Sequence, residues 1–409
     1  MTRSRADGSH MRTAEPLPDV RRPRADAAHA EGPARPSPDR VVLHVGSPKS
    51  ATTYLQHRLA LNAAHLADQG VVLPRGRGLH HPLSLHYRAA LDLRGMRHGR
   101  RGWEVDGRWD ELVGRIRRSD GVRLVSHEVF AGATREQARQ AVADLDGLEV
   151  HVVVSATDLG RQLAGGWQES VKHGGVRSFG EFLEAARRRE LPLMRDLNLR
   201  RVFEVWGAEL PAERLHLVTV PRASSQRSLP WERFAAALGI DPASAPREPN
   251  RDDRVNASLG VAQTRLLREL NQRLGESVRR GGRYHRIVQE VLVRRGLRTT
   301  PQARIELDPA HHEWVRRTGE RWQRWIRQRG VQVHGDLADL IPVAMPAERW
   351  VDPDANRLDA MDGVGVGALA ELLAEVDRRG RPTWWAQDKV RRVRRRLRRP
   401  GVEDRDQDR

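Results

Sequence analysis

Short runs of β-branched and other apolar residues alternate along the chain with longer stretches in which apolar positions recur every three or four residues. The first run, 40–45, ends at Gly46, and helical spacing then continues from Thr53 to Leu66. This order predicts a buried strand, a loop and a helix. Further strands are predicted at 71–74, 122–126, 149–155 and 215–220, and helices at 179–189, 197–209, 231–238, 259–274 and 313–329. Strands that alternate with helices favour an α/β fold with a mainly parallel central sheet covered on both faces.

The two ends of the chain differ from this pattern. Residues 1–39 alternate Arg, Asp, Pro and Ala without apolar periodicity, which predicts a disordered leader. Residues 40–345 form the predicted domain, and residues 346–409 are predicted to be a linker and a basic helical tail. In that tail, Val390, Val393 and Leu397 give a narrow apolar stripe among arginines.

Composition narrows the classes of protein. The 409 residues are 38% hydrophobic, which is enough for a buried core. The chain has no cysteine, and this excludes disulfides, thiolate metal sites and cysteine nucleophiles. No run of 18 apolar residues predicts a membrane span, and the start lacks an export pattern, so we expect a cytoplasmic protein.

The formal net charge of +18 raises nucleic acid as a partner. Lysine occurs only at positions 49, 172 and 389, however, so arginine makes up nearly all of the basic residues, as a skewed codon composition would produce. Much of the excess charge also lies in the tail at 381–399. We therefore expect no specific nucleic acid, but peripheral contact of the tail with anionic membrane, where Trp384 and Trp385 would help. A basic protein that binds membrane surfaces or nucleic acid through this tail is the alternative from another class.

The loop 46–53 between the first strand and its helix carries the strongest chemical signal. In this position several backbone N–H groups and the positive end of a helix converge, which predicts an anion site. Lys49 would add a mobile charge, and Ser50, Thr52 and Thr53 would add hydroxyl donors. The loop does not match GxxxxGK[ST], so a generic ATPase or GTPase is disfavoured. The simpler interpretation is a strand-to-helix turn with Ser and Thr as caps.

The segment PKSATTYLQ at 48–56 resembles the PKSGTT(W/Y)LQ loop of bacterial sulfotransferases that use 3′-phosphoadenylyl sulfate (PAPS). Segments 126–128, 161–163, 167–169, 171–174 and 256–260 are similar to the same family, and the resemblance covers about residues 40–345. It implies a P-loop-type three-layer sandwich, PAPS as co-substrate and no metal. It also implies that the 5′-phosphosulfate is held by Ser47, Pro48, Lys49, Ser50, Ala51, Thr52 and Thr53.

Three positions depart from the family pattern. The family binds the 3′-phosphate of PAPS with an arginine after a central strand and a serine eight positions later, and these positions hold Thr157 and Gly165 here. We expect Arg161, one helical turn along, to replace the missing guanidinium. Ala51 stands where the family has glycine, so its methyl would crowd the phosphosulfate if φ is positive. These departures leave an inactive sulfotransferase-like scaffold as an alternative.

The implied reaction moves a sulfuryl group from PAPS to a hydroxyl of a small molecule, such as a carbohydrate, lipid or secondary metabolite. His127, at the end of a predicted strand, is the first candidate for the base because imidazole titrates near neutral pH, and Glu128 is the second. Adjacent residues that leave a strand tend to point in opposite directions, so we expect only one of them to face the acceptor.

Lys49 would stabilise the leaving oxygen. A kinase-like phosphotransferase is the alternative enzyme, but it needs carboxylates for Mg²⁺ near Lys49, and the sequence offers no convincing pair.

Two tryptophan-bearing segments have ambiguous roles. Trp167 lies in a segment similar to the family and could line the acceptor pocket, although a buried tryptophan is more often part of the core. Helix 313–329 carries Trp314, Trp322 and Trp325 among arginines. We expect these arginines to form a solvated face, with an acidic acceptor as a further possibility.

Overall fold

The computed structural model describes residues 39–355 except 77–80, 82, 97–104, 223–227, 247–258 and several positions between 275 and 302, together with residue 365. The predicted leader, up to residue 38, lies outside the described residues, and so does the predicted tail helix. The expectation of membrane contact by the tail therefore has no structural counterpart here. No helix within the described ranges is both long and apolar enough to cross a membrane.

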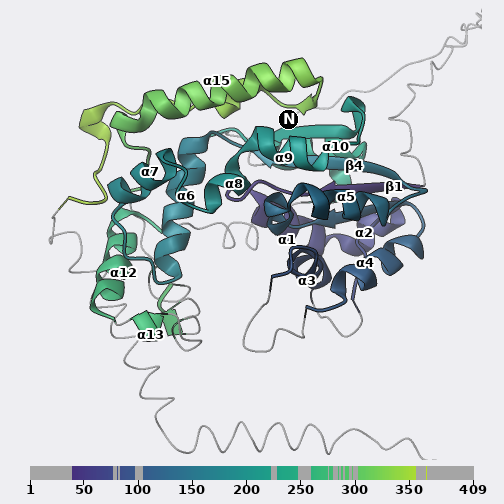
Figure 1. Ribbon diagram of the computed structural model, residues 1–409, viewed down its shortest axis with the longest axis horizontal. Helices are drawn as coiled ribbons and strands as arrows, with labels where there is room; N and C mark the ends of the chain where they lie inside the picture. The colour runs from purple at the N-terminus through teal and green to yellow at the C-terminus, as the bar shows by residue number, and fades with distance from the viewer. Residues whose placement is uncertain are drawn as a thin grey trace, which may run out of the picture. The chain divides into compact units, whose positions relative to one another are not determined.

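A six-stranded, all-parallel sheet forms the centre of the fold, in the order β2-β3-β1-β4-β5-β6 (Figure 1). The prediction of an α/β fold with a parallel sheet is confirmed. The strands are buried along most of their length, which explains why they read as continuous apolar runs. They are β1 (Arg40–His44), β2 (Val71–Val72), β3 (Val122–Ser126), β4 (Glu149–Ala156), β5 (Leu215–Thr219) and β6 (Gln332–His334).

The first strand lies inside the sheet, between β3 and β4. From β1 the chain first builds β2 and β3 on one side, and it then crosses to build β4, β5 and β6 on the other. The loops after β1 and β4 therefore leave the sheet in opposite directions. In open α/β sheets, ligands bind in the crevice that this reversal opens at the carboxyl ends of the strands.

Helices cover both faces of the sheet. On one face, Val42, Val153 and Val218 share a core with α1 (Thr52–Leu61), α2 (Ala63–Asp68) and α10 (Leu229–Leu238). The larger core lies on the opposite face of the sheet. The residues that alternate with these along the same strands contribute to it. The helices of this core are α3 (Ser84–Leu93), α4 (Arg108–Arg117), α5 (Arg135–Ala143), α6 (Leu159–Lys172), α7 (Phe179–Arg187), α8 (Leu193–Leu197), α9 (Leu199–Trp206), α12 (Val261–Arg273) and α15 (His312–Arg329), and a short helix, α13 (Glu276–Arg279), follows α12.

Some predicted elements differ from the structure. The helix expected from Thr53 to Leu66 is broken at Asn62, and the helix expected at 197–209 begins only after Asn198, whose side chain caps α9 by accepting from the backbone N–H of Arg201. The edge strand β6 is not predicted, because its three residues contain no apolar run. The bounds of α6 are not predicted either, although Arg161 is expected one helical turn after Thr157; Gly160, Gly165 and Gly166 weaken the helical signal there.

Candidate functional site

The loop that connects β1 to α1 has an unusual backbone. The φ angles of Gly46, Lys49 and Ala51 are +73°, +64° and +62°, whereas Ser50 does not have a positive φ. Two non-glycine residues in the left-handed region represent local strain, which accumulates at functional sites. Where left-handed and right-handed backbone conformations alternate, as they do from Lys49 to Ala51, successive backbone N–H groups tend to point toward one place. The positive end of the α1 dipole lies at the same end of the loop. A simple turn with a Ser or Thr cap is not what the structure has, because no side chain caps α1.

Ala51 adopts the positive φ at which its methyl group is unfavourable. We expect Ala51→Gly to raise the free energy of unfolding by about 0.5–1 kcal/mol, because removal of the left-handed penalty exceeds the added entropy of the unfolded chain. Urea unfolding measures this difference. Ala60→Gly, inside α1, should instead destabilise by about 1 kcal/mol, and equal destabilisation by both substitutions would contradict the prediction.

A buried polar network supports the loop from below. The Ser50 hydroxyl donates to the carbonyl oxygen of Ser47 at 2.5 Å and lies 2.8 Å from the Ser155 hydroxyl. His44 joins the Ser126 and Ser155 hydroxyls through its two ring nitrogens, at 2.8 and 3.1 Å. Burial lowers the pKa of His44 to about 4, so the ring is neutral. Ser50 is fully buried, and its side chain holds the loop in shape; it is not exposed to a ligand as the sequence suggested.

Lys49 lies at the exposed rim of the loop and forms an ion pair with α6. Its Nζ donates to Glu169 Oε2 at 3.0 Å, and Lys172 contacts the same oxygen at 3.5 Å. Burial would raise the pKa of Glu169, but the two lysines outweigh it and bring the pKa to about 2. A Cβ added at Gly165 would lie 3.2 Å from Lys49 Cγ, so the stem of Lys49 packs on the bare backbone of α6.

The remaining loop residues are held mainly by their neighbours. Gln162 of α6 donates from Nε2 to Ser47 Oγ at 2.7 Å and to the carbonyl oxygen of Pro48 at 2.9 Å. Thr52 is buried, and Thr53 is exposed at the start of α1. The sequence does not predict the role of Gln162, because Gln162 and the loop residue that it contacts are more than a hundred positions apart.

The predicted 3′-phosphate positions lie after β4. Thr157 is fully buried, and Arg161 donates from Nη1 to its hydroxyl at 2.7 Å. The guanidinium one turn along thus reaches the side chain at the position of the missing arginine. Arg222, just beyond β5, lies near Arg161 and pairs with Glu306 at 2.6 Å. Sequence analysis missed Arg222, although its place after a predicted strand was an available signal.

The pKa of Arg161 is lowered, first by burial. Asp158 and Glu306 act to raise it, and Arg222 and Arg304 lower it further. Two cations at one edge of the sheet raise the local positive potential. Asp158 and Glu306 compensate part of this charge, and the guanidinium groups of Arg161 and Arg222 remain donors of the kind that phosphate oxygens accept.

His127 and Glu128 end β3 next to the loop. The backbone N–H of Val129 donates to His127 Nδ1 at 3.2 Å, so the ring proton is on Nε2 and no ring nitrogen has a free lone pair. Glu128 Oε2 accepts from Gln56 Nε2 at 2.9 Å and lies 4.0 Å from His127 Nδ1. Burial acts to raise the pKa of Glu128, but His127, Gln56 and Lys49 lower it overall, so the carboxylate is ionised.

The expectation that His127 and Glu128 diverge is wrong. The strand alternation ends at His127, since Glu128 begins a 3₁₀ turn (Glu128–Gly132), and the two side chains therefore lie together. Gly46 lies next to Glu128: a Cβ added at Gly46 would be only 2.8 Å from Glu128 Cα. Trp167 belongs to the core: it is fully buried, packs against Phe179 and donates to the carbonyl oxygen of Arg177.

Comparisons of the chain with family models, with curated proteins and with solved structures find no match. The geometry above is therefore the basis for a functional proposal.

Proposed function

We propose that the protein is a sulfotransferase that uses PAPS, built on a P-loop-type three-layer sandwich. The observation that carries the proposal is the loop 46–51 before α1, at the strand crossover, where Gly46, Lys49 and Ala51 have positive φ angles. The resemblance of 48–56 to the sulfotransferase loop gives this anion site its specific ligand. The inactive scaffold is the alternative that the binding experiment below addresses.

In this proposal the backbone N–H groups of the loop and Lys49 bind the 5′-phosphosulfate, while Arg161 and Arg222 bind the 3′-phosphate. Lys49 leaves Glu169 when the anion arrives. Glu169 stays close to Lys172, 3.5 Å away, so its charge remains partly compensated. Ser50, Ser47 and Gln162 preserve the shape of the loop without contacting the ligand.

The proposed transfer forms a bond between the acceptor hydroxyl oxygen and sulfur and breaks the bond from sulfur to the bridging phosphate oxygen. Glu128 takes the acceptor proton, because it is ionised and His127 Nδ1 is already occupied by the Val129 N–H. Lys49 stabilises the negative charge that develops on the leaving oxygen. The products are a sulfate ester and adenosine 3′,5′-bisphosphate.

Titration calorimetry with adenosine 3′,5′-bisphosphate tests the proposal without knowledge of the acceptor. We expect Lys49→Ala to weaken binding roughly ten- to hundredfold, the range of a lost charge-assisted contact. Glu169→Gln should strengthen binding severalfold, because Lys49 then has no carboxylate to leave. Arg139→Ala, which removes an exposed arginine of α5 that pairs with Glu209, is the control for net charge and should change little.

The absence of binding to the unsubstituted protein would reject an active PAPS site and leave the scaffold alternative. Equal weakening by Lys49→Ala and Arg139→Ala would reject the loop as the binding site, since general charge would then explain the effect.

A further inference from the structure

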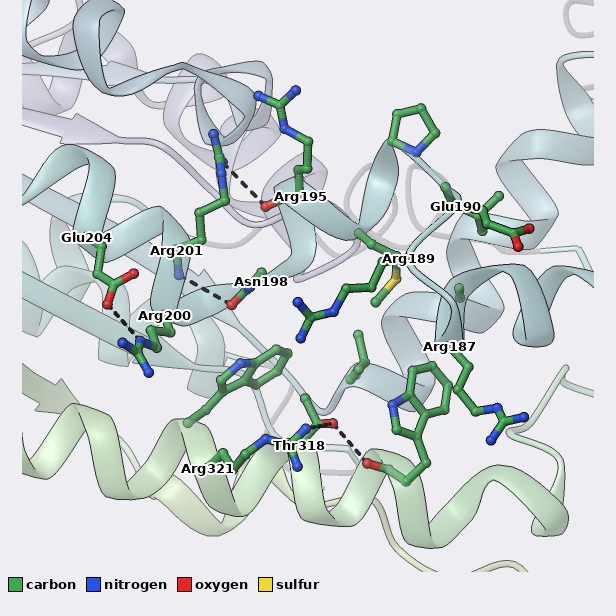
Figure 2. A pocket seen from close by; sticks show the side chains of 17 residues that line it. Arg187, Arg189, Glu190, Arg195, Asn198, Arg200, Arg201, Glu204, Thr318 and Arg321 are labelled. Atoms are coloured by element: carbon green, nitrogen blue, oxygen red, sulfur yellow. Dashed lines mark hydrogen bonds and ion pairs between the residues drawn. The ribbon is translucent and has the colours of Figure 1, made fainter.

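A pocket with a volume of about 750 Å³ lies between α7, α8 and α9 on one side and α15 on the other. Figure 2 shows its lining, to which α15 contributes the lower wall in that view. None of the residues of the loop 46–51 lines it. The volume is typical of sites for small organic ligands.

The pocket has an excess of positive charge. Six of its lining residues are arginines and two are glutamates. Arg187 pairs with Glu184 outside the pocket, and Arg200 pairs with Glu204 at 2.7 Å. The other arginines have no acidic side chain within 4.0 Å among the described residues: Arg189, Arg195, Arg201 and Arg321.

The positive charges of the pocket arginines repel one another. The pKa of Arg201 is lowered, first by burial and then by Arg195 and Arg94, while Asp196 acts to raise it. Arg201 donates to the carbonyl oxygens of Ala131 and Ala133, so backbone dipoles hold its guanidinium in place. A bound anion would stabilise this arrangement further.

Arg189 is the central cation of the pocket. It follows α7 at the left-handed position of a helix-ending motif, with φ of +60° and with the N–H of Glu190 bonded to the carbonyl oxygen of Ala185. Glycine is the usual residue there, so arginine has a conformational cost of about 1 kcal/mol. Its guanidinium extends into the middle of the pocket, whereas Arg187 points away (Figure 2).

The pocket also has an apolar, aromatic wall. Trp314, Thr318 and Trp322 line it from α15, and their four-residue spacing places them on one face of that helix. Met194 and Leu191 line it from the other side. Arg321 is exposed, as the expected solvated face requires, and it also lines the pocket. Arg316 and Arg317 pair with Glu313.

We propose that this pocket binds an organic oxyanion that carries a flat ring, with the ring against Trp314 and Trp322 and the anionic group at Arg189. Tryptophan faces favour planar rings, and guanidinium groups favour sulfate, phosphate and carboxylate oxygens. The proposal is independent of the reaction proposed above, because it uses none of the loop residues.

Calorimetry with 2-naphthyl sulfate as the probe tests the site in the full chain. We expect binding to one site, and we expect both 2-naphthol and inorganic sulfate to bind at least tenfold more weakly, because each lacks one of the two recognised features. Arg189→Asn should weaken the probe roughly tenfold or more. Asparagine tolerates the left-handed backbone, so this variant is expected to fold normally.

Arg139→Asn is the control for charge, since it removes a guanidinium of α5 that pairs with Glu209, and neither residue lines the pocket. It should change the affinity less than twofold, as should Lys49→Ala, and Trp314→Ala should weaken binding. Equal losses in Arg139→Asn and Arg189→Asn would overturn the proposal. Loss of binding in Lys49→Ala would place the probe at the loop, and an absence of probe binding at millimolar concentration would reject the pocket.

Discussion

Acidification from pH 6.5 to pH 5 is expected to lower the free energy of unfolding by several kcal/mol. His44, His86 and His216 are buried, and burial lowers their pKa values to about 4, about 4 and about 3. In the unfolded chain they titrate near pH 6.5. Below that pH the unfolded state binds protons that the folded state does not bind. The free energy of unfolding therefore has its full value above pH 6.5, and it falls with decreasing pH until the folded pKa values are reached. Each group contributes a slope of about 1.4 kcal/mol per pH unit.

The contacts explain why these rings stay neutral. His86 Nδ1 accepts from the backbone N–H of Ser126, and its Nε2 donates to the carbonyl oxygen of Pro74. His216 lies between two other imidazoles, with His151 at 2.8 Å and His334 at 3.1 Å. A proton on His216 would therefore place positive charge within a row of histidines that crosses three neighbouring strands.

Urea unfolding at pH 7, 6.5, 6, 5.5 and 5 measures the slope. His44→Gln should make it shallower by about 1.4 kcal/mol per pH unit, whereas His65→Gln, at an exposed position of α2, should leave it unchanged. A stability that stays constant from pH 7 to pH 5 would contradict the assignment of these histidines as neutral and buried.

Gly46→Ala is expected to destabilise the protein by roughly 2–5 kcal/mol. The left-handed φ of +73° costs an alanine about 1–2 kcal/mol. In addition, its Cβ would lie 2.8 Å from both Cα and Cβ of Glu128, and separation of two buried backbones adds a cost of about 1–3 kcal/mol. The same displacement would move Glu128 away from the loop, so we also expect weaker binding of adenosine 3′,5′-bisphosphate.

Gly147→Ala separates the two causes. Gly147 has a φ of +85°, but nothing lies within 4 Å of its Cβ position, so only the backbone cost of about 1–2 kcal/mol applies. Urea unfolding of both variants gives the difference. Equal destabilisation would show that Gly46 and Glu128 do not pack as closely as described.

The sequence predicts the central strands well because each of them is a buried run of β-branched residues. It predicts the position of the loop for the same reason, since a strand, a short break and a helix are adjacent in the chain. It does not predict β6, which is a short edge strand that only its pairing with β5 defines. The bounds of α6 are missed because the glycines that let Lys49 and Leu193 approach its backbone are also poor helix formers.

Much of the candidate site was beyond sequence reasoning because its contacts are long-range. Lys49 and Glu169 are 120 positions apart, and no local pattern connects them. The positive φ of Ala51 depends on the course of the loop and not on the residue type, which disfavours it. The pocket beneath α15 combines arginines from α7–α9 with tryptophans from a helix that begins more than a hundred residues later.

The position of β1 within the sheet has a consequence for synthesis of the chain. Among the strands of the described residues, β1 leaves the ribosome first, but its partners are β3 and β4, and His44 and Ser126 are 82 positions apart. Both edges of a β-branched segment therefore stay unpaired until most of the first half of the chain has been translated. During that interval the nascent segment 40–45 is open to wrong pairing, so we expect the yield of folded protein to depend on translation speed and on chaperones that cover it.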